Sequence, residues 1–205
     1  MLHKSLSNFP FKRSLITPSW CYWDNVFTEM ELNLITHYLS NLELEKGRVG
    51  GYEGNEKGIV SDKIRRSDVS FFSCNANTNW IFDRFNNIIQ SINDQFYNFD
   101  LEGYESIQYS EYKDFEKGEY IFHMDSAFDS SEVLPRKLSL AMLLNDDFDG
   151  GEFQINIGTE SNSIALETRK NRAIIFPSFL IHRVAPVTRG VRKSLVIWVL
   201  GPKFR

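Results

Sequence analysis

Two stretches in the first half of the chain contain apolar residues that recur every three or four positions, the spacing of an amphipathic helix. The first follows Thr28-Glu29-Met30-Glu31, a sequence typical of a capping box, and the second is expected to begin around Asn77 and Thr78. The residues expected to be buried are Leu32, Leu34, Ile35, Tyr38, Leu39 and Leu42 in the first helix, and Ile81, Phe85, Ile88, Ile89, Ile92 and Phe96 in the second.

The pattern changes after Tyr104 to short alternating segments separated by turn sequences such as Asn145-Asp146-Asp147 and Asp149-Gly150-Gly151. An earlier strand is predicted over residues 64–72, and the first 27 residues are expected to form an extended arm with one short strand. Two helices followed by many strands predict an α+β, mainly β domain, in which the helices brace one face of a β-sandwich or barrel.

Five glycines between residues 47 and 58 predict a flexible loop after the first helix. An exposed connector is the simpler interpretation, and a border of a substrate entrance is the alternative.

The composition is that of one packed globular domain. The chain has 205 residues, of which 42% are hydrophobic and 14% aromatic. Its net charge of −4 gives no basic reservoir for binding nucleic acid, which excludes that class in its usual form. Only two cysteines are present, Cys21 and Cys74, and both are interpreted as packing residues of a reduced protein. No signal peptide and no run of roughly 18 apolar residues is found, so we expect no membrane span and a cytoplasmic location.

Candidate metal ligands stand in strand-like context at His123, Asp125 and His182. Residues two apart in a strand point to the same face, so His123 and Asp125 can bind one ion together. With His182 from another strand they would form a facial triad of two histidines and one carboxylate, which suits non-haem Fe(II) because coordination positions stay open. Alone, a His-x-Asp pair is more often structural. The other two histidines, His3 and His37, lie in the terminus and in the first predicted helix.

Arg192 begins a predicted strand in which Arg192, Ser194, Val196 and Trp198 share one face. An arginine inside a sheet is costly unless an anion neutralises it, and its planar fork matches a carboxylate. A dicarboxylate 2-oxo acid could chelate the iron at one end and reach Arg192, aided by Ser194, at the other. The alternative for Arg192 is an ordinary ion pair. Trp198 is interpreted as a core wall.

The second half of the chain resembles the 2-oxoglutarate and Fe(II)-dependent oxygenases, and within them the prolyl 4-hydroxylase-like branch with the PKHD-type hydroxylases. The resemblance covers roughly residues 107–202. It rests on Gly118-Glu119-Tyr120-Ile121-Phe122-His123-Met124-Asp125, Lys137-Leu138-Ser139-Leu140-Ala141-Met142-Leu143-Leu144-Asn145, Gly150-Gly151-Glu152-Phe153, Ile175-Phe176-Pro177-Ser178 and His182-Arg183-Val184-Ala185-Pro186-Val187-Thr188-Arg189-Gly190-Val191-Arg192-Lys193-Ser194-Leu195.

The resemblance implies a double-stranded β-helix, or jelly roll, braced by N-terminal helices. We expect one dioxygenase domain over residues 1–205, with a helical support region (1–100) and a catalytic jelly-roll core (101–205). His123, Asp125 and His182 would be the iron ligands, and Arg192 would anchor 2-oxoglutarate. Relatives also carry a cosubstrate-binding tyrosine on the preceding strand, for which a strict count gives Phe115 and a longer loop gives Tyr112. An Arg-x-Ser element near the entrance of relatives resembles Arg65-Arg66-Ser67, which a solvated strand end explains equally well.

The resemblance implies an enzyme that uses Fe(II), 2-oxoglutarate and O2, with ascorbate as an optional addition. It would hydroxylate an unactivated C–H bond and release succinate and CO2, with peptidyl proline as the first expectation and a small molecule next. One alternative is a non-catalytic jelly-roll binding protein with a structural metal. The other is a cupin-like metalloenzyme that needs no 2-oxo acid.

Overall fold

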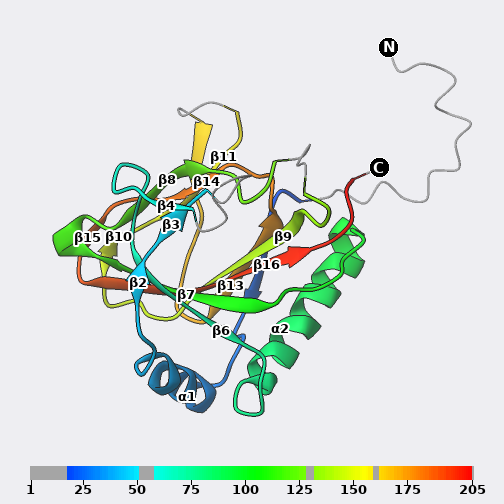
Figure 1. Ribbon diagram of the computed structural model, residues 1–205, viewed down its shortest axis with the longest axis horizontal. Coiled ribbons are helices and arrows are strands. Elements are labelled where there is room, and N and C mark those ends of the chain that lie inside the picture. The colour runs from blue at the N-terminus through cyan, green and yellow to red at the C-terminus, as the bar shows by residue number, and fades with distance from the viewer. Residues whose placement is uncertain (1–17, 51–57, 128–131, 159–161, 205) are drawn as a thin grey trace, which may run out of the picture.

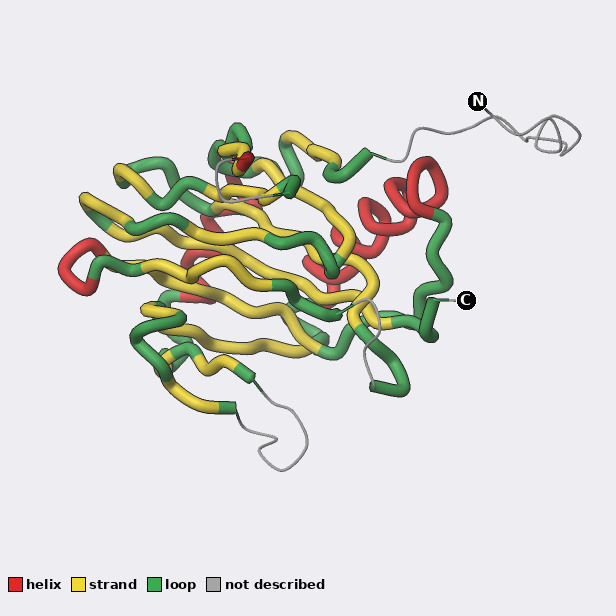
Figure 2. The backbone as a smooth tube through the Cα atoms, turned by 90° about the horizontal axis from the view of Figure 1, so that it is seen from above, coloured by secondary structure: helices red, strands yellow, loops and turns green. Residues whose placement is uncertain are grey.

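Two antiparallel sheets lie face to face in the computed structural model, which describes residues 18–50, 58–127, 132–158 and 162–204 (Figure 1, Figure 2). The larger sheet has the strand order β1 (Cys21–Asp24), β13 (Arg172–Pro177), β9 (Arg136–Leu143), β16 (Val191–Leu200), β7 (Ser106–Lys113), β6 (Asp68–Ser73) and β2 (Glu45–Lys46). The smaller sheet has the order β12 (Ser163–Ala165), β11 (Phe153–Asn156), β14 (His182–Val184), β8 (Glu119–His123) and β5 (Arg65–Arg66).

Short elements complete the sandwich. Two further strand pairs are β3 (Arg48–Val49) with β4 (Ile59–Val60), and β10 (Asp149–Gly150) with β15 (Val187–Arg189). A π-helical turn, Asn93–Tyr97, extends the second helix, and a 3-10 turn, Asp114–Glu116, joins β7 to β8. The predicted mainly β, jelly-roll class is confirmed. Within the described ranges, no helix is long and apolar enough to cross a membrane.

Both predicted helices are present and cover the outer face of the larger sheet. Helix α1 (Glu29–Leu39) begins with the predicted capping box, in which the Glu31 amide donates to the Thr28 hydroxyl at 3.2 Å and the Thr28 amide donates to the Glu31 carboxylate at 2.7 Å. Its buried side includes Leu32, Ile35 and Leu39. Leu34, expected to join them, is 56% exposed, because it lies on the opposite side of the helix.

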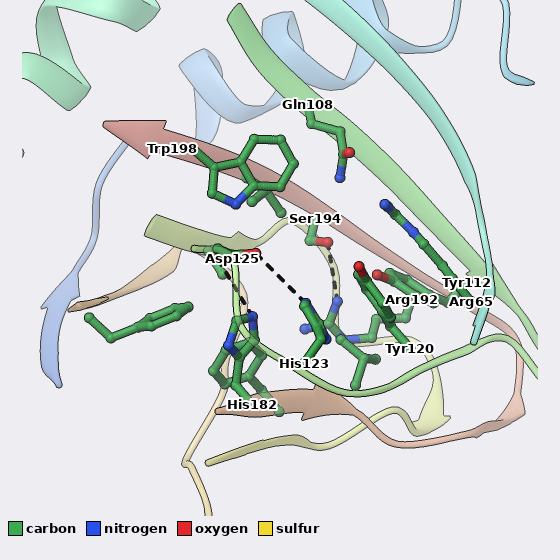
Figure 3. Close-up of a pocket in the computed structure, with 15 residues that line it drawn as sticks. Arg65, Gln108, Tyr112, Tyr120, His123, Asp125, His182, Arg192, Ser194 and Trp198 are labelled. Atoms are coloured by element: carbon green, nitrogen blue, oxygen red, sulfur yellow. Dashed lines mark hydrogen bonds and ion pairs between the residues drawn. The ribbon is translucent and has the colours of Figure 1, made fainter. Parts of the chain in front are cut away.

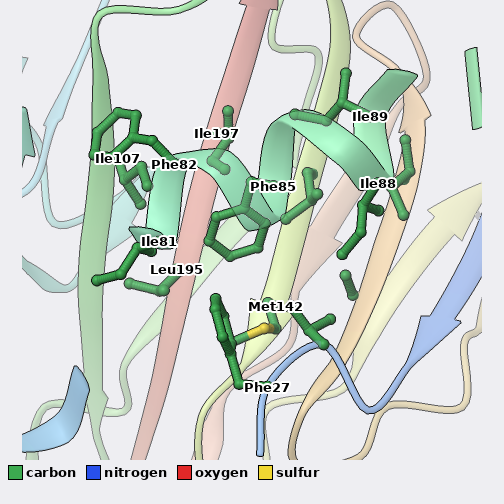
Figure 4. Close-up of a cluster of buried hydrophobic side chains, with 14 of the residues drawn as sticks. Phe27, Ile81, Phe82, Phe85, Ile88, Ile89, Ile107, Met142, Leu195 and Ile197 are labelled. Atoms are coloured by element: carbon green, nitrogen blue, oxygen red, sulfur yellow. The ribbon is translucent and has the colours of Figure 1, made fainter. Parts of the chain in front are cut away.

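Helix α2 (Asn79–Ile92) carries the larger share of the outer core. Phe85 is fully buried and meets the ring of Phe27 edge-on, with centroids 5.4 Å apart. Figure 4 shows these rings between the helix and the larger sheet, close to Leu195 and Ile197 of β16 and Met142 of β9. Of the other predicted positions of its apolar face, Ile81, Ile88, Ile89 and Ile92 are buried, whereas Phe96 lies in the π-helical turn after α2 and is only partly buried.

Strand β16 therefore separates two cores by simple alternation. Leu195 and Ile197 point outward to the helices. Arg192, Ser194 and Trp198 point inward to the space between the sheets. That inner space is closed on one side by a second cluster of apolar residues drawn from both sheets, which comprises Tyr112, Phe153, Ile155, Leu166, Ile174, Phe176, Val184 and Val187.

The strand predicted over residues 64–72 is two strands in different sheets. Arg65 of β5 pairs with Tyr120 of the smaller sheet, whereas Asp68 of β6 pairs with Glu111 of the larger one. The chain crosses between the sheets at the buried Ser67. Side-chain alternation continues through such a crossing, so the sequence pattern does not reveal a change of hydrogen-bonding partner.

Two smaller expectations need correction. The region after α1 contains the short strands β2, β3 and β4 besides loop, and residues 51–57 of the predicted loop lie outside the described residues, as do residues 1–17 of the arm. Gly58 has a φ of 63°, and a Cβ there would come within 2.7 Å of the Gly50 carbonyl oxygen, so this turn requires glycine. Cys21 is buried as expected, but Cys74 is exposed and does not pack in the core.

Replacing Phe85 by alanine should lower the free energy of unfolding by about 3–5 kcal/mol, because a large ring is removed from a fully closed space. Urea unfolding followed by circular dichroism measures this value. The matched control is Met30→Ala in α1, whose side chain is 72% exposed and whose loss should change stability by less than about 0.5 kcal/mol. A similar small effect for both variants would contradict the packing described here.

Candidate iron and cosubstrate site

His123, Asp125 and His182 come together on the inner face of the smaller sheet (Figure 3). One ligand atom from each lies within 4.8 Å of the others. His123 is the last residue of β8, His182 is the first of β14, and the two are direct partners in the antiparallel ladder. This pairing places the two imidazoles side by side, with ring centroids 4.3 Å apart.

Backbone hydrogen bonds orient both imidazole rings. The Nδ1 atom of His123 lies 2.8 Å from the Ile121 carbonyl oxygen, and that of His182 lies 2.8 Å from the Leu180 carbonyl oxygen. In each ring Nδ1 therefore carries the proton, and Nε2 is left with its lone pair. The two Nε2 atoms face the Asp125 carboxylate at 3.7 and 3.6 Å, the arrangement of ligands around a shared ion.

The sequence pattern predicted that Asp125 lies in the same strand as His123, and this prediction is wrong. Strand β8 ends at His123, because the partner strand β14 begins opposite it at His182. Asp125 is held instead by the turn before β14 and by β9: its amide donates to the Ser178 carbonyl oxygen at 3.0 Å, and Ser139 donates to its carboxylate at 2.6 Å. The carboxylate reaches the histidines through these contacts rather than through strand alternation.

The protonation states of His123 and Asp125 match those of metal ligands. Burial, reinforced by the neighbouring His182, lowers the pKa of His123 to about 3, so its imidazole is neutral near pH 7. Burial alone would raise the pKa of Asp125, but His182, His123 and the Ser139 hydrogen bond outweigh it and leave this pKa below its usual value. A neutral imidazole and an ionised carboxylate are the forms that bind metal.

Arg192 enters the same pocket from the larger sheet. Only 3% of its surface is exposed, its Nε donates to the Gly151 carbonyl oxygen at 3.0 Å, and Nη1 donates to the Ser194 hydroxyl at 3.1 Å. No carboxylate among the described residues pairs with it, so the ordinary ion pair is absent there. Burial lowers the pKa of Arg192 from its usual value, which reflects an uncompensated charge. Gly151 leaves room for it, since a Cβ there would lie 2.9 Å from the Arg192 Cδ.

Of the two positions considered for a cosubstrate tyrosine, only Tyr112 faces the pocket. It is buried on β7 opposite Arg192, and the guanidinium carbon lies 5.7 Å from the centroid of its ring. Phe115 is 76% exposed in the 3-10 turn. The 3-10 turn between β7 and β8 lengthens this connection, so the inward-facing tyrosine lies earlier in the chain than a strict count back from His123 gives.

Tyr120 also lines the pocket, although the sequence pattern did not indicate it. Tyr120 lies three positions before His123, so strict alternation would place the two side chains on opposite faces of β8. The pairing of β8 with β14 is irregular, however, and β8 contains one extra residue between these positions. This bulge turns both side chains toward the pocket. Their rings stack at 3.5 Å between centroids, and burial raises the pKa of Tyr120 to about 12. No local sequence signal marks this bulge.

The pocket is open to solvent and encloses about 460 Å³ of empty space when its open mouth is included. Trp198, expected to be a core wall, borders it, and the buried indole Nε1 has no hydrogen-bond partner among the described residues. Arg65 and Gln108 also enter the pocket. The remaining lining residues are Ala141, Phe153, Phe176, Val184 and Val196.

Comparison with known proteins shows which family the second half of the chain resembles. Residues 107–200 match the model of the 2OG-Fe(II) oxygenase superfamily. A PKHD-type hydroxylase of Psychrobacter sp. (strain PRwf-1) is 37% identical over 86 residues, covering 39% of this chain and 32% of its own. A PKHD-type hydroxylase of Xylella fastidiosa (strain M12) is 37% identical over 94 residues, covering 41% of this chain and 40% of its own. The chain thus spans well under half the length of these curated relatives.

Solved structures show the same fold over most of the chain. A prolyl hydroxylase from Trichoplax adhaerens, in complex with a hypoxia inducible factor oxygen degradation domain peptide fragment, has a TM-score of 0.71 at 16% identity, covering 91% of this chain and 86% of its own. A Pseudomonas putida prolyl-4-hydroxylase has a TM-score of 0.66 at 18% identity, covering 90% and 94%.

The match over residues 107–200, the PKHD-type relatives and a jelly roll that resembles those of prolyl hydroxylases together support a prolyl 4-hydroxylase-like 2-oxoglutarate/Fe(II) oxygenase.

Proposed function

We propose that the protein is a 2-oxoglutarate- and Fe(II)-dependent dioxygenase that hydroxylates an unactivated C–H bond. The observation that carries this proposal is the meeting, in one pocket, of an open three-residue ligand set with a buried arginine that has no acidic partner among the described residues. The ligand set fits Fe(II), and the arginine fits the far carboxylate of 2-oxoglutarate.

The residues fit these two groups chemically. His123, Asp125 and His182 supply two imidazole nitrogens and one carboxylate, the ligand set of non-haem Fe(II) oxygenases. Ser139 holds the carboxylate in place, as an outer-shell partner does. Arg192 would anchor the distal carboxylate of 2-oxoglutarate, with the Ser194 hydroxyl and Tyr112 beside it.

When bound, the iron and 2-oxoglutarate supply the redox chemistry: O2 places one oxygen atom in succinate, formed with release of CO2, and the other in the C–H bond of the substrate. The protein would position the reacting molecules and exclude water from the pocket. Phe153 and Phe176 lie against His182 with centroids 5.4 and 4.7 Å from its ring, and Tyr120 covers His123. These rings keep water from the reacting side of the ligands.

We further propose a peptide or protein substrate with proline as the hydroxylated residue, and a small molecule as the second candidate. Support comes from the names of the solved neighbours, which are prolyl hydroxylases, one of them bound to a peptide. A cytoplasmic setting would suit the two free cysteines. Residues 1–205 would act as one domain, in which the part before residue 100 contributes strands and Arg65 to the sandwich besides the supporting helices.

The alternatives explain less of the pocket. A structural metal is usually enclosed by four protein ligands, whereas the described residues gather three. A cupin-like enzyme without a 2-oxo acid has no use for the buried charge of Arg192.

His182→Ala should weaken Mn(II) binding at least about 100-fold, because one of three ligands is lost and outer-shell changes alone already cost about 10–100-fold. Isothermal titration with Mn(II) under reducing conditions measures the affinity. His37→Ala, on the exposed side of α1, is the matched control and should leave the affinity unchanged. Equal affinities for the two variants would refute the ligand assignment.

The Fe(II)-loaded protein, given 2-oxoglutarate, ascorbate and a pool of proline-containing peptides, should form succinate and a peptide heavier by one oxygen atom on proline. Mass spectrometry of the peptides and of succinate follows both products. Asp125→Ala should abolish both, and the exposed Asp146→Ala should abolish neither. Oxygen found on another residue type would overturn the proline proposal while leaving the dioxygenase in place.

A further inference from the structure

Arg65 is a second buried arginine in the pocket, and it has no role in the reaction proposed above. Only 5% of its surface is exposed, and it lines the same space as the three candidate ligands. Figure 3 shows its side chain projecting from β5 into the pocket, on the side of Gln108. Its Nε donates to the Ser67 hydroxyl at 2.7 Å, and its guanidinium lies 4.9 Å from the centroid of the Tyr120 ring. The two terminal amino groups have no hydrogen-bond partner among the described residues.

Two other arginines of the chain have the anionic partner that Arg65 lacks. The buried Arg172 donates to the Asp24 carboxylate at 2.8 Å, and Arg66, next to Arg65 but partly exposed, pairs with Glu119. No ion pair joins Arg65 to any carboxylate in the described part of the chain. A buried guanidinium without an anion is costly, so a ligand that supplies one gains binding energy.

The proposed cofactors do not supply this anion. An Fe(II) ion, Asp125, Arg192 and the dianion of 2-oxoglutarate neutralise one another, so the charge of Arg65 remains without a counterion. One further negative charge, carried by the molecule that is oxidised, would complete the balance.

Arg65 is also held rigidly in place. Ser67 binds its Nε, and the Gly47 amide donates to the Ser67 carbonyl oxygen at 2.8 Å. A Cβ on residue 47 would come within 2.7 Å of the Arg65 Nε, so the glycine leaves the space that this side chain occupies. A preorganised fork of two free amino groups is suited to bidentate binding of a carboxylate.

We propose that Arg65 binds a carboxylate of the substrate, so that the enzyme selects an anionic substrate. This inference rests on the proposed function and narrows its substrate class. The carboxylate belongs either to the hydroxylated residue itself, as a chain-terminal or free amino acid, or to an acidic side chain beside it in a peptide. The two sources share one chemistry and differ in where the negative charge is attached.

The test measures binding without turnover, on protein loaded with Mn(II) and saturated with 2-oxoglutarate in the absence of oxygen. Isothermal titration compares two matched pairs of probes. The first is an N-acetylated peptide ending in proline, with a free carboxylate or a carboxamide at its end. The second is a carboxamide-ended peptide with internal proline, flanked by aspartate or by asparagine. The carboxylate member of one pair should bind roughly 100-fold more tightly than its amide, and the pair that shows this identifies the source.

Variants assign the preference to Arg65. Arg65→Gln should reduce the carboxylate preference to about twofold or less, and Arg65→Lys should restore part of it, because the charge is retained and the fork is lost. The affinity for 2-oxoglutarate should stay unchanged in Arg65→Gln, since Arg192 is its proposed anchor. Arg66→Gln is the matched control and should keep the wild-type preference.

The proposal is overturned if neither pair shows a preference, if no probe binds the wild-type protein, or if Arg65→Gln keeps the wild-type preference. It is also overturned if Arg65→Gln loses 2-oxoglutarate instead, because Arg65 then serves the cosubstrate. The proposed hydroxylation is judged separately, by formation of succinate and oxidised product. A carboxylate preference without oxidation would therefore support the Arg65 site and reject the reaction.

Discussion

The pairing of β8 with β14 is the constraint on which the site depends. It sets His123 directly opposite His182, ends β8 at that point, and leaves Asp125 free to turn back toward both rings. The bulge in the same pairing turns Tyr120 inward against His123 and toward Arg65. A shift of this register by one residue would move one imidazole to the outer face and separate the ligands.

Charge organises the pocket as strongly as geometry does. The smaller sheet contributes Arg65, the turn after β8 contributes Asp125, and the larger sheet contributes Arg192, so charged groups that water would solvate far better line both sides of the pocket. The two arginines lack acidic partners within the described residues, and burial is tolerated because the surrounding sandwich is held by two large apolar clusters. Buried cations without a counterion lower the stability of the fold, and binding of an anion would offset that cost.

Local patterns in the sequence were sufficient to predict both helices, the mainly β second half of the chain and much of the pocket. The capping box at Thr28, the apolar face of α2 and the inward side of β16 at Arg192 follow from periodicity and local chemistry alone. What failed depends on pairing between distant segments. The split at Ser67, the bulge that turns Tyr120 inward and the support of Asp125 by Ser139 all arise from strand partners that alternation does not specify.

The most direct test of the account is anaerobic titration of the Fe(II)-loaded protein with 2-oxoglutarate, monitored by the weak visible charge-transfer band of the chelate. The wild-type protein should develop this band, and Arg192→Ala should require far more 2-oxoglutarate to reach it, because the distal carboxylate loses its anchor. Iron that binds without any band on addition of 2-oxoglutarate would contradict the central claim. It would favour a structural metal or a cupin-like reaction instead.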